Sequence, residues 1–389
     1  MKPAPIEVRG RVGAPLGMAP AAFLRDYWGK RPLLVRGALA DFECPLTPDD
    51  LAGLACIEGS LGRIVRHDRR RDRWHLETGP FAEERFAILG RRDWTLLVQD
   101  VDRWDPEVRA LLRLVDFLPR WRIDDVMVSY AVAGGSVGAH VDQYDVFLLQ
   151  GMGQRRWQID ARPGAPLDFR EDAPIRLLKR FEASHDWVLQ PGDILYLPPR
   201  VPHFGEALCE CLTFSLGMRA PSSAELLAAF AAQQAQELDE SRRYADPDLR
   251  IATDPSEIDA TTVRRVRRAL MDVLALDDAT LADWFGRFMS VYRTATLPRR
   301  RRIHASVIVE RLARGATLVS SQSVRLNWSR AGKGARLHAN AQTLAIDAAL
   351  ASRLCAADAR IDGGQFAKLT EVDRDALVEC VRRGWLEFA

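Results

Sequence analysis

Between residues 126 and 219 the sequence consists of short runs of β-branched and aromatic residues separated by glycine or polar turns. This feature constrains the fold most strongly, because such runs are typical of strands in antiparallel hairpins. The expected strands span residues 126–132, 137–142, 146–150, 155–159, 187–189, 194–197 and 212–216. A series of short strands of this kind predicts a double-sheet jelly roll.

The segment before the jelly roll carries mixed signals. Residues 21–36 predict a short helix that ends at Gly29, a turn and a strand, and residues 49–54 predict another short helix. The alternating stretch 63–76 indicates one or two exposed strands. Residues 106–115 predict a helix, since Asp105 can cap its start and Pro106 suits its first position.

After Pro221 the pattern changes from strands to helices. Ser222 and Glu225 form a capping box, and apolar residues then recur at helical spacing as far as Phe288. This apolar surface exceeds what one small bundle needs, and packing against a second subunit would bury it. We therefore expect a barrel domain at 1–220, followed at 221–298 by a helical region that forms a dimerisation surface.

Residues 298–302, a proline followed by four arginines, are interpreted as a linker. Beyond it, helical and strand-like segments alternate, which fits a small α/β domain of winged-helix size at 299–389. The expected class is α+β, with a jelly roll, a helical region and a winged-helix-like domain in that order.

Composition excludes several classes of protein. Lys and Arg number 55 against 53 Asp and Glu, so the net charge does not point to nucleic acid. The six cysteines are too scattered for a disulfide framework. We find no apolar leader and no stretch of roughly 20 apolar residues that could span a bilayer. These features predict a cytoplasmic protein.

The residues that point to chemistry are three potential metal ligands. Of seven histidines, only His140 stands in an H-x-D arrangement, with Asp142. On a strand, positions i and i+2 face the same side, so both side chains would point into the barrel. His203 follows a strand of large apolar residues and a proline-rich turn. Two imidazoles and one carboxylate on one face match the facial triad of non-haem Fe(II) oxygenases.

An oxygenase of this kind needs a cation for its keto-acid cosubstrate. The distal carboxylate of 2-oxoglutarate suits the planar fork of an arginine, and Arg155 and Arg156 open an expected strand just after the H-x-D. Neighbouring residues on a strand face opposite ways, so only one of them can point inside. Spacing alone does not choose between them.

Three motifs resemble the bacterial ribosomal oxygenases, which are Jumonji-C-type cupins. They are His140-Val-Asp-Gln-Tyr-Asp-Val-Phe, Gly151-x-Gly-x-Arg-Arg-Trp157, and Gly192-Asp-Ile-Leu-Tyr-x-Pro-Pro199 continued by Pro202-His203. The N-terminal Phe23-Leu-x-x-Tyr-Trp-Gly-Lys-Arg-Pro-Leu33 fits the same family. The likeness covers essentially the whole chain and departs from the family pattern at Gln154, where relatives often carry a basic residue.

The resemblance implies a specific activity. Members of the family hydroxylate an arginine of the large-subunit ribosomal protein L-sixteen at the β-carbon, with Fe(II) as cofactor and 2-oxoglutarate and O₂ as cosubstrates. By motif match, the metal ligands fall on His140, Asp142 and His203, and the cosubstrate arginine falls on Arg155. The family also has a helical dimerisation region and a C-terminal winged-helix-like domain, which implies a homodimer.

A cationic substrate requires carboxylates or aromatic faces at the mouth of the barrel. Tyr144 and Asp145, which closely follow the metal pair, are the candidates for substrate binding. Ser129 faces the same cavity by strand alternation and is a candidate for cofactor binding.

Other functions remain open at this point. A Jumonji-type oxygenase could act on another protein or on nucleic acid. A cupin could instead sense a ligand while the C-terminal domain binds DNA, but the candidate recognition helix 344–354 carries only one arginine and one acid, so we do not expect direct nucleic-acid binding. A metal-dependent isomerase or storage-type barrel would have more histidines around its metal and no arginine for a keto acid.

Overall fold

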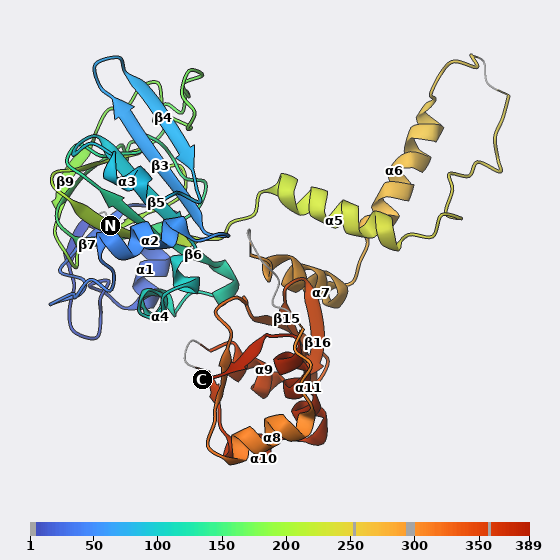
Figure 1. Ribbon diagram of the computed structural model, residues 1–389. Coiled ribbons are helices and arrows are strands. Elements are labelled where there is room, and N and C mark those ends of the chain that lie inside the picture. The colour runs from blue at the N-terminus through green and yellow to red at the C-terminus, as the bar shows by residue number, and fades with distance from the viewer. Residues whose placement is uncertain (1–4, 252–253, 293–299, 357–358) are drawn as a thin grey trace. The chain divides into compact units, whose positions relative to one another are not determined.

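The structure is a computed structural model that describes residues 5–251, 254–292, 300–356 and 359–389. It divides into two compact units, Met1–Ala220 and Pro221–Ala389, which run from blue to green and from yellow-green to red in Figure 1. Within the described residues, no helix combines the length and the apolar character that crossing a membrane would require.

The first unit is built on two sheets. The larger has nine strands in the order β1-β2-β10-β7-β12-β6-β5-β3-β4, and the smaller has the order β11-β8-β9. The strands are β1 (Glu7–Arg9), β2 (Leu33–Arg36), β3 (Leu61–Asp68), β4 (Arg73–Thr78), β5 (Trp94–Gln99), β6 (Ile123–Ala131), β7 (Val146–Met152), β8 (Arg155–Ile159), β9 (His185–Leu189), β10 (Ile194–Leu197), β11 (His203–Ala207) and β12 (Cys211–Met218). Apart from the parallel pair β1–β2, neighbouring strands are antiparallel. The predicted jelly roll is confirmed.

Short helices pack against the large sheet. They are α1 (Pro20–Asp26), α2 (Pro48–Cys56), α3 (Glu84–Ala87) and α4 (Pro106–Ala110), with 3-10 turns η1 (Val101–Arg103), η2 (Leu111–Val115) and η3 (Arg120–Arg122). Phe23, Leu51 and Val108 join strand residues in one core cluster, which leaves the other face of the sheet free to form the barrel interior. The single helix expected at 106–115 is two pieces, α4 followed by η2.

One expected strand is absent, and it is the one that carries the H-x-D motif. Residues 137–142 form no strand. They contain a single bridge, between His140 and His203. Glycine explains the difference, because Gly134 and Gly138 both have positive φ, of 79° and 76°, and the backbone there cannot continue as a strand. The side chains of His140 and Asp142 are therefore not aligned by strand alternation.

The second unit is helical at its start and mixed at its end. Its helices are α5 (Ser223–Glu237), α6 (Ala260–Leu274), α7 (Asp278–Met289), α8 (Ala305–Ala313), α9 (Ala348–Leu354), α10 (Gly363–Ala367) and α11 (Glu371–Arg382). Its strands are β13 (Leu318–Ser320), β14 (Asn327–Ala331), β15 (Gly334–Ala339), β16 (Gln342–Ile346), β17 (Arg360–Ile361) and β18 (Leu386–Phe388). They form two three-stranded sheets, β17-β13-β18 and β14-β15-β16.

Helix α7 falls in the range predicted for the helical region, yet it packs on the sheet β14-β15-β16. The side chain of Asn327 donates to the carbonyl of Gly286 at 3.1 Å, and Thr343 donates to Asp283 at 3.0 Å. The predicted boundary between residues 298 and 299 lies outside the described residues, so the three-way division of the chain stays a prediction.

The arginine run expected to be a linker is partly described. Arg300 forms an ion pair with Glu379 at 2.9 Å, and Arg301 pairs with Glu387 at 3.4 Å. These arginines are therefore bound to α11 and β18, whereas residues 298 and 299 lie outside the described part of the chain.

Candidate metal centre and cosubstrate cavity

The three candidate ligands come from two segments that the backbone holds together. His140 and Asp142 lie between β6 and β7, and His203 is the first residue of β11. The amide of His140 donates to the carbonyl of His203 at 3.0 Å, and the amide of His203 donates back at 2.9 Å. Two reciprocal hydrogen bonds thus fix one histidine opposite the other.

Both imidazoles have their tautomer set by a backbone carbonyl. Nδ1 of His140 lies 2.9 Å from the carbonyl oxygen of Gly138, and Nδ1 of His203 lies 2.9 Å from that of Val201. A carbonyl only accepts, so each Nδ1 must carry the proton and donate it. In the neutral ring, Nε2 then carries the lone pair that can bind a metal, which is the arrangement usual for a metal-bound histidine.

The donor atoms converge on one point. One ligand atom from each of His140, Asp142 and His203 lies within 4.8 Å of the other two, and Nε2 of His203 is 3.7 Å from Oδ2 of Asp142. An ion bound at about 2.1 Å would bring adjacent ligands to about 3 Å, so small side-chain movements complete the site. Two imidazoles and one carboxylate fit a ferrous ion and leave coordination positions for other ligands.

Burial keeps His203 in the form that binds metal. The residue is 2% exposed, and burial, reinforced by the neighbouring His140, lowers its pKa to about 4 despite the opposing effect of Asp142. The ring is therefore neutral near pH 7, and no proton has to leave before a metal binds.

Of the two arginines left open by spacing, Arg155 is inside and Arg156 is outside. Arg156 lies on the surface and pairs with Asp186. The side chain of Arg155 is 2% exposed and donates to Oγ of Ser129 at 3.2 Å and to the carbonyl of Gly205 at 3.4 Å.

Arg155 is a buried cation without a carboxylate partner among the described residues. Its Nε has no hydrogen-bond partner there, and burial lowers the pKa of its guanidinium. A buried unpaired charge is costly, so the site is built for an anion that the chain itself does not supply. The distal carboxylate of a keto acid is such an anion.

The ligand triad and Arg155 share one cavity of about 420 Å³. Its walls come from β3 to β8, from β11 and β12, and from the loop between β8 and β9. The lining includes Ser129 and Tyr144, two of the three further residues expected there, together with Asp125, Trp157 and Thr213. The metal, a small keto acid and one long side chain of a substrate can thus meet in a single space.

Comparisons with known proteins agree with this geometry. A JmjC domain model matches residues 110–226, and a model of the ROXA-like winged helix matches residues 269–387. The ribosomal protein uL16 3-hydroxylase of Escherichia coli is 38% identical over 274 residues, which are 70% of this chain and 71% of that protein. The chain belongs to the JmjC ribosomal oxygenases.

Solved structures of the family extend the likeness to almost the whole chain. YcfD, a ribosomal oxygenase from Escherichia coli, has been solved in complex with cobalt and 2-oxoglutarate, and it matches with a TM-score of 0.81 and 32% identity. The match covers 96% of this chain and 99% of that one. A complex of YcfD with cobalt and succinic acid has the same TM-score and coverage. The expected winged-helix-like domain is thereby confirmed.

Asp145 does not occupy the place expected of it in this ribosomal oxygenase. Its carboxylate accepts from the hydroxyl of Tyr196 at 2.5 Å, from the amide of Gly29 at 3.2 Å and from Arg122 at 3.1 Å. It is not part of the cavity wall. These contacts join the end of α1 to the barrel and argue against the predicted substrate-binding role.

Asp125 is the acidic residue of the cavity that the sequence argument missed. It is 7% exposed, and burial, with the neighbouring Asp124 and Asp100, raises its pKa to about 7. Strand alternation from Ser129 could have found it, since positions 125, 127 and 129 share one face of β6. Ser129, which also lies in the cavity wall, accepts a hydrogen bond from the guanidinium of Arg155.

Proposed function

We propose that this chain hydroxylates the β-carbon of an arginine in ribosomal protein uL16, with Fe(II) as cofactor and 2-oxoglutarate and O₂ as cosubstrates. The observation that carries the proposal is one cavity holding both the His-Asp-His set and a buried arginine that has no carboxylate partner among the described residues. We infer the substrate from the name of the Escherichia coli relative, ribosomal protein uL16 3-hydroxylase. When bound, ferrous iron supplies the oxidising chemistry that an unactivated C–H bond requires, with the keto acid converted to succinate and CO₂.

The residues of this chain bind and orient the reactants. His140, Asp142 and His203 hold the metal with both imidazoles neutral. Arg155 binds the distal carboxylate of 2-oxoglutarate through charge-assisted hydrogen bonds and so fixes the direction in which the keto acid meets the metal. Ser129 accepts one N–H of that arginine and keeps its fork in place.

The other end of the cavity suits a cationic side chain. Asp125 lies in the wall, and a guanidinium beside it would favour the ionised carboxylate and reverse the rise in its pKa. Tyr144 lines the same cavity, and its ring can pack against the aliphatic part or the face of an arginine. We assign both to substrate binding.

Incubation with recombinant uL16, Fe(II), ascorbate and 2-oxoglutarate tests the proposal directly. Peptide mapping should find the added mass of one oxygen atom on one arginine, with succinate formed in equal amount. The variant His140→Ala should give neither product. Succinate formation that uL16 does not stimulate, with unmodified peptides, would exclude this substrate.

We also propose that the active form is a homodimer. A groove between α5 and α7 is lined almost entirely by apolar side chains: Leu226, Leu227, Phe230, Leu274, Leu281, Ala282, Trp284 and Phe285, beside Asp278. Leu227 and Leu281 are 60% and 44% exposed. A second copy of the same surface would bury this groove, in keeping with the family's helical dimerisation region.

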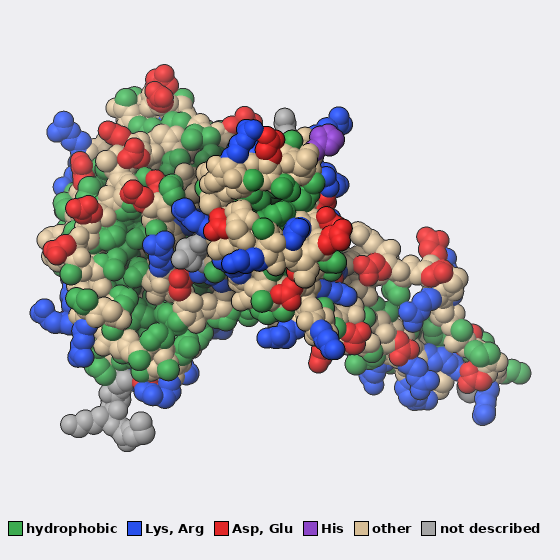
Figure 2. Space-filling view, turned by 90° about the horizontal axis from the view of Figure 1, so that it is seen from below, with side chains coloured by type: hydrophobic (Ala, Val, Ile, Leu, Met, Phe, Trp, Pro, Cys, Tyr) green, Lys and Arg blue, Asp and Glu red, His purple; other side chains and the backbone are tan. Residues whose placement is uncertain are grey.

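We propose that the reaction takes place in the cytoplasm, which a ribosomal protein substrate supports because bacterial ribosomes are assembled there. On the face drawn in Figure 2, basic and acidic side chains are intermixed. The substrate is proposed to be recognised as a polypeptide, by the cavity that holds the metal ligands.

A further inference from the structure

The loop between strands β8 and β9 of the small sheet contributes to the wall of the metal cavity. Residues 168–179, here called the strap, form a narrow turn in which the amide of Lys179 donates to Asp168 at 2.7 Å and that of Arg170 to Leu177 at 2.8 Å. The tip, residues 174–176, lines the metal cavity. The amide of Leu178 donates to the carbonyl of Ala139 at 2.8 Å, so the strap is bonded to the residue next to His140.

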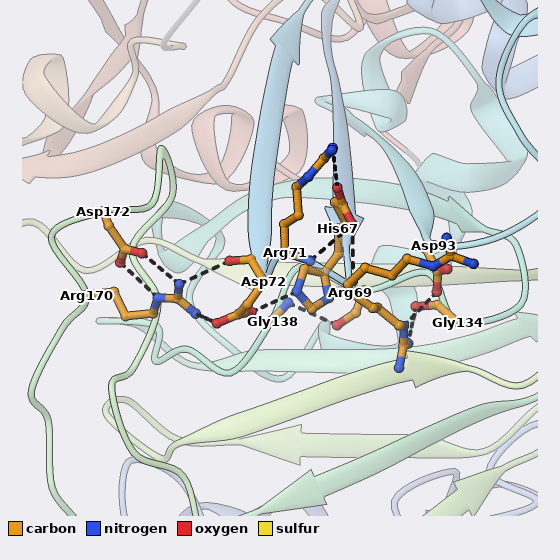
Figure 3. A network of polar contacts seen from close by, with 12 residues as sticks. His67, Arg69, Arg71, Asp72, Asp93, Gly134, Gly138, Arg170 and Asp172 are labelled. Atoms are coloured by element: carbon orange, nitrogen blue, oxygen red, sulfur yellow. Dashed lines mark hydrogen bonds and ion pairs between the residues drawn. The ribbon is translucent and has the colours of Figure 1, made fainter.

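The hairpin β3–β4 reaches the same place from the large sheet. Its side chain Trp74 stacks on His67 with ring centroids 4.0 Å apart and planes 8° apart. Nε2 of His67 lies 2.9 Å from Asp72, which in turn pairs with Arg170 of the strap at 2.7 Å. Figure 3 shows this chain of contacts from Arg170 through Asp72 to His67, with Gly138 close by.

Strap and hairpin meet on Gly138. A β-carbon at this position would lie 2.4 Å from Cδ2 of Leu177 and 3.1 Å from Cη2 of Trp74. The side chains of Leu177, from the strap, and Trp74, from the hairpin, therefore fill the space that a larger residue at position 138 would need. The carbonyl of the same glycine accepts the Nδ1 proton of His140, so the clamped residue is also the one that orients a metal ligand.

We propose that Trp74 and Leu177 are positioning residues for the metal centre: they clamp Gly138 so that its carbonyl fixes the ring of His140. The proposal rests on the proposed function insofar as His140 binds the metal. Outer partners of a ligating histidine set its orientation and basicity, and their loss commonly weakens metal binding by about 10–100-fold. A glycine with positive φ has no side chain of its own to hold it, so neighbours must supply the restraint.

Packing carries this effect more than the ion pairs do. Asp72 and Asp172, the two partners of Arg170, have side chains that are 62% and 68% exposed, and exposed pairs contribute little. Leu177 is 3% exposed. The expected order of importance is thus the two apolar clamps first and the Arg170 pairs second.

Cobalt(II) binding tests the proposal without turnover. Titration of the metal-free full-length protein with cobalt chloride, followed by visible absorption, should give a Kd about 10-fold or more higher for Trp74→Ala and for Leu177→Ala than for wild type. Trp74→Phe, which keeps a ring in place, should restore most of the affinity. Asp72→Asn should bind within about twofold of wild type.

Controls separate positioning from general damage. Trp328→Ala removes a half-buried ring from the second unit and should leave cobalt binding unchanged. In the metal-free state, hydrogen exchange of residues 138–142 should be faster in both clamp variants than in wild type. Should Trp74→Ala fail to fold, Leu177→Ala makes the same comparison from the strap.

The outcomes are distinct. Folded clamp variants that bind cobalt like wild type, with unchanged exchange at 138–142, would overturn the positioning role and leave the metal centre intact. An effect of Asp72→Asn as large as that of the clamp variants would show that the ion pairs, not the packing, hold Gly138. Wild-type protein that bound no cobalt would overturn the metal centre and this proposal together.

Discussion

Replacing Arg155 by Met should make the protein more stable without cosubstrate and less responsive to it. Arg155 is 2% exposed, and its guanidinium has no carboxylate partner among the described residues and makes hydrogen bonds of 3.2 and 3.4 Å. Replacing buried charges with apolar groups of similar volume often stabilises by about 1–4 kcal/mol. Loss of two weak hydrogen bonds and of the contact with Trp157, whose ring centroid lies 5.0 Å away, offsets part of this, so we expect a net gain of about 1–3 kcal/mol.

The cosubstrate should stabilise the wild-type protein much more than the variant. At 100 times its Kd, 2-oxoglutarate should stabilise the wild-type protein by about 2.7 kcal/mol. Removing one partner of a desolvated charge pair costs about 2–5 kcal/mol of binding, which raises the Kd by about 30-fold to 5000-fold. From the same concentration, Arg155→Met should therefore gain at most about 0.9 kcal/mol.

Thermal unfolding of the manganese-loaded protein, with and without 2-oxoglutarate, measures both effects. For a unit of this size, 1 kcal/mol corresponds to about 2–4 °C. Arg156→Met is the matched control, since the neighbouring side chain lies on the surface beside Asp186, and its response to 2-oxoglutarate should equal that of wild type. An Arg155→Met protein that is less stable than wild type and still responds fully would refute the reasoning.

Three further predictions follow from other parts of the structure. Asp125→Asn should raise the KM for a uL16 peptide by about 10–100-fold, as expected for losing one charged hydrogen bond, while 2-oxoglutarate affinity is unchanged; an unaltered KM would remove Asp125 from substrate binding. Burial is the main cause that lowers the pKa of His338 to about 4 in the folded protein, whereas the pKa is about 6.5 in the unfolded chain. Between pH 4 and 6.5, the unfolded chain therefore binds a proton that the folded chain does not bind. The free energy of unfolding of the second unit should therefore be highest above pH 6.5 and fall by at most about 3 kcal/mol as the pH drops to 4. Urea unfolding at several pH values measures this change. A free energy that stays constant over this range in wild type, or that depends equally on pH in His338→Gln, would contradict the prediction. Leu281→Glu, in the apolar groove, should give a monomer in sedimentation experiments with little loss of thermal stability, whereas an unchanged dimer would place the interface elsewhere.

The barrel was predictable because its signals are local. Runs at 146–150, 155–159 and 194–197 have strand length and end at glycine or polar turns, and the structure places strands there. The same local signals gave a wrong prediction for the H-x-D segment. Its alternating residues are typical of a strand, but the positive φ of Gly138 prevents the backbone from forming one. Only the pairing with His203, some 60 residues later, shows how the ligands meet.

The cavity wall was harder to predict because it depends on register between distant strands. Spacing could not decide between Arg155 and Arg156, and the contacts with Ser129 and Asp186 did. Asp145 was expected at the mouth of the barrel because it closely follows the metal pair, but long-range partners such as Tyr196 bind it inside the fold. The roles of Trp74 and Leu177 rest on segments far from the motif in sequence, which no local pattern reveals.

The central claim is that three side chains hold one metal ion. Isothermal titration of the metal-free protein with cobalt(II) should show one ion bound per chain, and the single variants His140→Ala, Asp142→Ala and His203→Ala should each lose that binding while keeping their fold by circular dichroism. Undiminished binding of one equivalent by any of the three variants would contradict the assignment of that ligand and, with it, the proposed centre.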